Sequence, residues 1–91
     1  MTETEFSKII GIPARVLITL YRSDSIPVTS LQEKSKISPT ALYNALRKLL
    51  QLGLIMEERE KDFPRRRLIS LTGKGWRVAR LLVQIEEILS V

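Results

Sequence analysis

Apolar residues recur every three or four positions along most of this 91-residue chain, and that spacing is typical of amphipathic helices. It predicts five helices. They cover about residues 2–10, 12–24, 29–35, 39–52 and 73–90. The fourth helix has the clearest pattern, because its apolar positions fall within one arc when each residue advances by about 100°. These expected core positions are Leu42, Ala45, Leu46 and Leu49.

Residues that favour helix ends flank several of these segments. Thr29 is followed three residues later by Gln32, which fits a capping box between side chains and backbone N–H groups. Ser38 stands before the fourth helix, where serine often accepts a backbone hydrogen bond. Gly53 is expected to end that helix, and Thr72 is expected to cap the last one. Two helices separated by a tight turn predict a helix-turn-helix.

A hairpin is predicted between the fourth and the last helix. Residues 54–60 and 65–71 are strand candidates joined by a turn, and a very short extended piece is expected near Ile26. This order predicts an α+β, mainly α, fold: a winged helix-turn-helix with a two-stranded wing and a long C-terminal helix. One domain is expected over residues 1–91, with residues 73–91 as a dimerisation helix.

Composition narrows the class of protein. An excess of Lys and Arg over Asp and Glu gives a net charge of +5, which favours an anionic partner, nucleic acid before acidic membrane. Cys and His are absent, so no metal site, cofactor or catalytic residue is predicted, and an enzyme is not expected. No apolar run reaches the ~18 residues of a membrane span, and the polar N-terminus is unlike a signal peptide. A cytoplasmic protein is therefore expected.

The polar side of the fourth helix is a candidate for reading DNA. Its stripe consists of Thr40, Asn44, Arg47 and Gln51, flanked by Tyr43 and Lys48. In the major groove, Asn can pair with adenine and Arg with guanine through two hydrogen bonds each. Base contacts are expected from Thr40, Tyr43, Asn44 and Arg47. The stripe by itself fits an ordinary solvated helix face equally well.

The hairpin favours the DNA-binding interpretation. Its cations Lys61 and Arg65 to Arg67 repel one another unless an anion compensates them, although nearby carboxylates could instead pair with them in an ordinary surface hairpin. Ten basic and four acidic residues give +6 over residues 38–80, whereas residues 1–37 carry +1. Contacts to the DNA backbone are expected from Thr29, Ser30, Gln32, Ser38, Lys48, Arg65, Arg66 and Arg67.

The segment SPTALYNALRKLLQLGLI (38–55) and the hairpin that contains PRRRLISLTGKG (64–75) resemble the winged helix-turn-helix transcriptional regulators of the PadR and MarR type. The similarity covers about residues 26–80 and is closest to the PadR family in the recognition segment. It implies a dimeric DNA-binding regulator. In such a regulator, residues 39–52 would enter the major groove. The wing, which covers about residues 54–71, would touch the adjacent minor groove or backbone.

The last helix carries an apolar stripe that we expect to form a homodimer interface. The stripe consists of Val78, Leu81, Leu82, Ile85, Ile88 and Leu89, with Trp76, Ala79 and Val83 on a different side. A two-fold dimer predicts a pseudo-palindromic site on double-stranded DNA. The alternative is a winged helix that binds another protein within a transcription or assembly complex. No effector is identified, although a small ligand could lie near Tyr21 and Trp76.

Overall fold

The computed structural model describes residues 11–89, and its elements follow the predicted order. They are α2 (Gly11–Tyr21), β1 (Ile26–Pro27), α3 (Val28–Ser35), α4 (Pro39–Gln51), β2 (Ile55–Arg59), β3 (Arg67–Leu71) and α5 (Gly73–Leu89). The predicted mainly helical α+β fold is confirmed. The helix expected at residues 2–10 lies outside the described residues.

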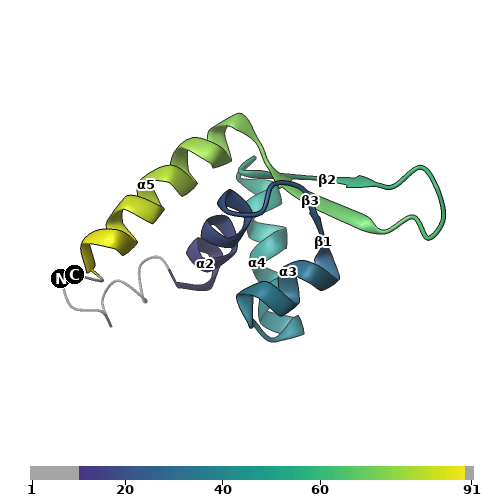
Figure 1. The fold of residues 1–91 in the computed structure, drawn as a ribbon, viewed down its shortest axis with the longest axis horizontal. Coiled ribbons are helices and arrows are strands. Elements are labelled where there is room, and N and C mark those ends of the chain that lie inside the picture. Colours follow the sequence, from purple (N-terminus) through teal and green to yellow (C-terminus); the bar gives the residue numbers. More distant parts are fainter. Residues whose placement is uncertain (1–10, 90–91) are drawn as a thin grey trace.

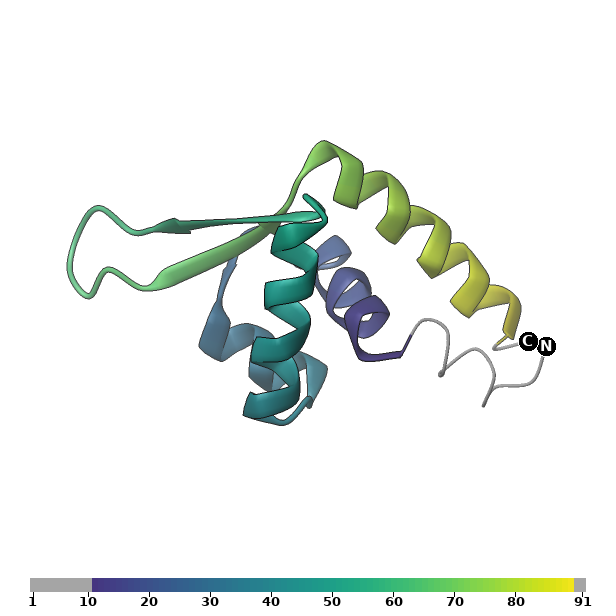
Figure 2. The same cartoon turned by 180° about the vertical axis from the view of Figure 1, so that it is seen from behind.

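Helix α2 lies at the centre of the core, between α4 and α5 (Figures 1 and 2). Val16 and Leu20 of this helix are almost completely buried. The core positions predicted for α4 are buried too, with exposed fractions of at most 3 %. Leu31 from α3 and Ile69 from β3 fill the remaining centre. The wing and α5 leave this body in opposite directions (Figure 1).

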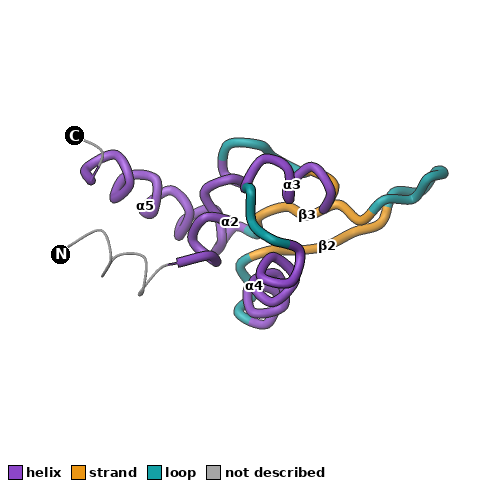
Figure 3. Tube along the Cα trace, turned by 90° about the horizontal axis from the view of Figure 1, so that it is seen from below, coloured by secondary structure: helices purple, strands orange, loops and turns teal. Residues whose placement is uncertain are grey.

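The sheet is antiparallel and has the strand order β1-β3-β2. Strands β2 and β3 pair from Ile55 opposite Leu71 to Arg59 opposite Arg67, which confirms the predicted hairpin, although both strands are shorter than expected. The extended piece at Ile26 pairs with Ile69, so it adds a third strand at the base of the wing. Beyond β1 the wing is a two-stranded ribbon that projects past the body (Figure 3).

Helices α3 and α4 form the helix-turn-helix. Lys36 ends α3 in a left-handed conformation with φ 56°, and its N–H donates to the Gln32 carbonyl. The capping box predicted for Thr29 is wrong: Pro27 is the N-cap residue of α3, and none of the described side chains caps that helix. Ser38 is the N-cap residue of α4, as predicted, but its side chain makes no capping hydrogen bond.

A close contact joins the end of α4 to the start of α5. Gly53 turns the chain with φ 72°. The Thr72 hydroxyl accepts from the Gly75 N–H at 3.0 Å and donates to the Gly53 carbonyl at 2.7 Å, so Thr72 caps α5 as predicted. A Cβ atom on Gly75 would lie 1.7 Å from the carbonyl oxygen of Leu54. Only glycine fits at this position, and it allows α5 to start directly against the backbone that follows α4.

Candidate nucleic-acid interface

The polar stripe of α4 lies on the surface, opposite the face that packs into the core. The four residues of the stripe are all exposed, namely Thr40, Asn44, Arg47 and Gln51. Lys48, which lies beside them, is exposed as well. Within residues 11–89, no hydrogen bond or ion pair occupies these side chains. Thr40 and Gln51 are about 16 Å apart along the helix axis, because an α-helix rises 1.5 Å per residue. The stripe is therefore available to a partner over about three helical turns.

A groove of about 270 Å³ separates α4 from the wing. Its lining comes from Tyr43, Leu46, Arg47, Leu50 and Arg67. The guanidinium of Arg67 lies 5.9 Å from the centre of the Tyr43 ring, within the range of a cation–π interaction. Tyr43, which was predicted to read bases, thus contacts the wing. This contact helps to hold α4 and the hairpin side by side.

Ion pairs occupy two of the three consecutive wing arginines. Arg67 donates to both carboxylate oxygens of Glu57, at 2.6 and 2.8 Å, and Arg66 lies 2.8 Å from a Glu60 oxygen. The hydrogen bond from Arg67 lowers the pKa of Glu57 below its usual value. The salt-bridged hairpin considered from the sequence therefore describes Arg66 and Arg67, and their cations are already partly neutralised.

Arg65 differs from its two neighbours. It lies before β3 with φ 56°, and its carbonyl oxygen accepts a hydrogen bond from the Arg59 side chain at 3.1 Å. Its own side chain is exposed and unpaired among the described residues. Arg59 was not predicted as part of the site. The strand register could have indicated it, because Arg59 pairs directly with Arg67 across the hairpin.

The other residues predicted to hold the DNA backbone lie near the starts of α3 and α4. Thr29 and Ser38 are exposed, whereas Ser30 and Gln32 are half-buried. Because the first N–H groups of a helix have no partner within it, both helix starts can hold phosphate oxygens.

The sequence model of the MarR family matches residues 14–62, which is more than half of the chain and runs from α2 into the wing. The chain belongs to the MarR family. The resemblance to the MarR type is thereby confirmed.

Solved structures agree with this MarR-family assignment. A MarR-family transcriptional regulator from Silicibacter pomeroyi is 25% identical, with a TM-score of 0.75 over 88% of this chain and 56% of that chain. A mutant of Lactococcus lactis ZitR is 35% identical, with a TM-score of 0.75 over 86% of this chain and 53% of that chain. SSV1 F-93 is 30% identical, with a TM-score of 0.74 over 86% of this chain and 88% of that chain. Our chain thus spans about half the length of the first two proteins. No relative was found among curated proteins.

The last helix of this MarR-family chain divides its apolar residues differently from the predicted stripe. Leu82 is buried in the core of its own chain, together with Ala79 and Val83, and Val78 is half-buried. The outward apolar face is therefore smaller than expected. It consists of Leu81, Ile85, Ile88 and Leu89, with exposed fractions from 37% to 73%.

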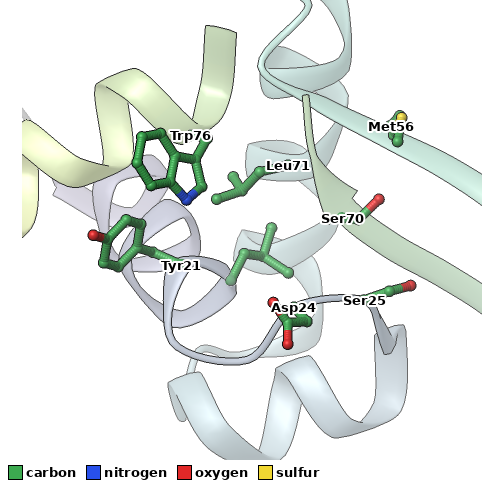
Figure 4. Close-up of a pocket in the computed structure, with 8 residues that line it drawn as sticks. Tyr21, Asp24, Ser25, Met56, Ser70, Leu71 and Trp76 are labelled. Atoms are coloured by element: carbon green, nitrogen blue, oxygen red, sulfur yellow. The ribbon is translucent and has the colours of Figure 1, made fainter. Parts of the chain in front are cut away.

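A second hollow, of about 230 Å³, lies between the end of α2 with the loop after it, the start of α5, and strands β2 and β3 (Figure 4). The Tyr21 and Trp76 rings stand at one end of it, with their centres 5.8 Å apart. Asp24 and Ser70 supply polar groups along its wall. The two aromatic residues at which a small ligand was considered are thus brought together.

Other kinds of site find no support in the described part of the chain. Among residues 11–89, no three His, Cys, Asp or Glu side chains gather as a metal site would require. The same residues contain no helix that is long and apolar enough to cross a membrane.

Proposed function

We propose that this chain binds double-stranded DNA as a homodimer and regulates transcription. Helix α4 would enter the major groove, and the wing would contact the adjacent minor groove or backbone. The observation that carries the proposal is that an unoccupied polar stripe on α4 lies beside a cationic hairpin across one groove. A DNA-binding role also fits the predicted cytoplasmic location.

The chemistry of the side chains supports different roles for different residues, some at base edges and others at phosphates. Asn44 and Arg47, at the middle of the stripe, have the donors and acceptors that base edges require. Lys48, Lys61 and Arg65 are exposed cations suited to phosphates. Arg66 and Arg67 can contribute only part of their charge, because Glu60 and Glu57 already pair with them.

The outward apolar face of α5 supports the dimer. Leu81, Ile85, Ile88 and Leu89 are exposed in the single chain, and contiguous exposed apolar side chains commonly mark an interface. A two-fold axis beside α5 would place two copies of α4 in successive major grooves, about 34 Å apart. The binding site should then be pseudo-palindromic.

The test is a titration of the chain with a random-sequence duplex at about 50 mM and about 200 mM salt, followed by fluorescence anisotropy. We expect binding at low salt that weakens steeply at high salt, because bound cations release the counterions of DNA. Arg65→Ala should reduce the slope of log affinity against log salt by about one. Absence of binding at low salt would favour the alternative, a winged helix that binds another protein.

A further inference from the structure

The tip of the wing carries a single, almost fully exposed aromatic side chain. Phe63 has an exposed fraction of 93%, the highest among the large apolar residues in the described part of the chain. The next most exposed, Ile88 at 73%, belongs to α5 at the other end of the molecule (Figure 1). The Phe63 side chain is therefore not part of the hydrophobic core formed by the described residues.

Hydrogen bonds on both sides of Phe63 hold the tip in one shape. The N–H of Arg65 donates to the Asp62 carbonyl at 2.8 Å, which closes a tight turn around residues 62–65. The N–H of Glu60 donates to the Arg66 carbonyl at 3.0 Å and extends the ladder of the hairpin by one step. An ordered turn thus presents Phe63 outward, so less conformational entropy is lost when a partner binds it.

The surroundings of Phe63 are cationic. Residues 59–67 contain five basic and two acidic side chains, a net charge of +3. Lys61 and Arg65 stand two residues before and after Phe63, and both are exposed. An apolar partner surface would not match these flanking charges, whereas a groove with phosphates on both walls and bases at its floor would match both the ring and the cations.

We propose that Phe63 inserts into the minor groove as an apolar wedge, while Lys61 and Arg65 hold the phosphates on its two walls. Proteins commonly place Phe, Leu or Ile against base steps in this way, partly unstacking and bending the duplex. The inference rests on the proposed function. It adds recognition of the shape of the DNA to recognition of its charge. The ring would select for how easily the DNA deforms.

Insertion of Phe63 as a wedge predicts a specific sequence preference in the bound DNA. Pyrimidine–purine steps such as TA unstack easily, whereas A-tracts are stiff. Sites should therefore favour a TA step where the wing tip lands, even though no hydrogen bond from the wing reads those bases. Replacing that step with AA should weaken binding of the wild-type chain by about fivefold.

The experiment uses the full chain and a duplex selected from a random pool, prepared in two forms that differ only by TA or AA at the wing position. Phe63→Ala should lower the TA-to-AA affinity ratio from about five to about one and reduce the duplex bend measured by end-to-end energy transfer. Phe63→Leu, which keeps an apolar wedge, should retain most of the ratio. Arg65→Ala should weaken both duplexes alike and leave the ratio unchanged.

Two results would overturn the wedge while leaving the proposed function intact. One is an unchanged ratio and bend in Phe63→Ala, with binding still sensitive to substitution of Asn44. The other is a loss of binding to vesicles of anionic lipid in Phe63→Ala, with DNA binding unaffected, which would assign Phe63 to a membrane surface. If the wild-type chain bound no duplex at all, the proposed function would fail and the wedge with it.

Discussion

Helices α4 and α5 both pack an apolar face against α2, yet their outward faces differ in chemistry. On α4 the outward face is polar and cationic, with Asn44 and Arg47 at its middle. On α5 the outward face is apolar toward the C-terminal half, where Ile85 and Ile88 are exposed. Both inward faces pack into the same core. The contrast between the outward faces therefore points to different partners.

The two faces suit the two kinds of surface that the proposed dimeric DNA-binding protein would meet. A hydrated anionic groove takes polar and cationic groups, and a second copy of α5 takes apolar ones. We call the close backbone contact between Leu54 and Gly75 the joint between α4 and α5. It connects these two helices rigidly, because the backbones touch there without an intervening side chain. In a dimer formed through α5, this joint would help to set the spacing between the two copies of α4.

The largest effect should follow from placing a charge on the apolar face. Ile85→Asp would bury an unpaired carboxylate in the proposed interface, and we expect dimerisation to weaken by about 3–5 kcal/mol. Light scattering over a range of concentrations measures this change, and circular dichroism checks that the chain remains folded. Ile85→Leu is the control and should remain dimeric. A wild-type chain that is monomeric at high concentration would contradict the assignment of this face.

The joint between the helices should be almost as sensitive. Gly75→Ala would place Cβ at 1.7 Å from the Leu54 carbonyl oxygen, so α5 must shift, and we expect a loss of about 3 kcal/mol in the free energy of unfolding. Urea denaturation measures it. The matched control is Gly73→Ala, two residues earlier in the same turn, where an added Cβ meets no atom within 4 Å. Equal stability of the two variants would show that the joint is not tight.

On the polar face, Asn44 and Gln51 provide an internal comparison. Asn44→Ala should weaken binding to a selected site by about 1–3 kcal/mol and relax the sequence preference, because a bidentate base contact is lost. Gln51→Ala removes a similar amide from the C-terminal end of the stripe, where we expect little effect. Affinities for the selected and a random duplex measure both. An equal loss on both duplexes in Asn44→Ala would exclude a role in base reading.

Much of α4 and the wing could be predicted because the deciding signals are local. The spacing of Leu42 and Leu46 determines which face of the helix is buried, and thereby which face remains exposed. Thr72 was identified as a cap because a threonine before a helix accepts a backbone N–H from the first turn. These interactions join residues that are close in sequence.

The features that were missed depend on contacts between distant residues. The extended piece near Ile26 was predicted, but its pairing with β3 was not, because that pairing joins residues more than forty positions apart. The requirement for Gly75 comes from Leu54, about twenty residues earlier, and a turn between strand and helix could have explained that glycine equally well. Leu82 and Leu81 share one periodic stripe, and only the packing of α5 on the rest of the fold decides that Leu82 is buried.

The smallest effect concerns the contact between the wing and α4. Glu57→Gln removes the charge that holds Arg67 beside Tyr43, and we expect a loss of about 0.5 kcal/mol in the free energy of unfolding at neutral pH, since both partners are partly exposed. Glu58→Gln is the control, because Glu58 faces the other side of the strand and has no ion pair among the described residues. Its stability should match that of the wild type.

The pH dependence gives this small effect a distinct signature. The pKa of Glu57 is lower in the folded chain than its ordinary value of 4.5, so the unfolded chain binds the proton more readily. The stabilisation is therefore complete above that ordinary value and is lost as the pH falls through the folded pKa. Urea denaturation of wild type and Glu57→Gln should show a difference at pH near 7 that shrinks in acid. A difference that persists undiminished in acid would mean that the ion pair does not hold the wing, and that Arg67 is positioned by Tyr43 and the strand pairing instead.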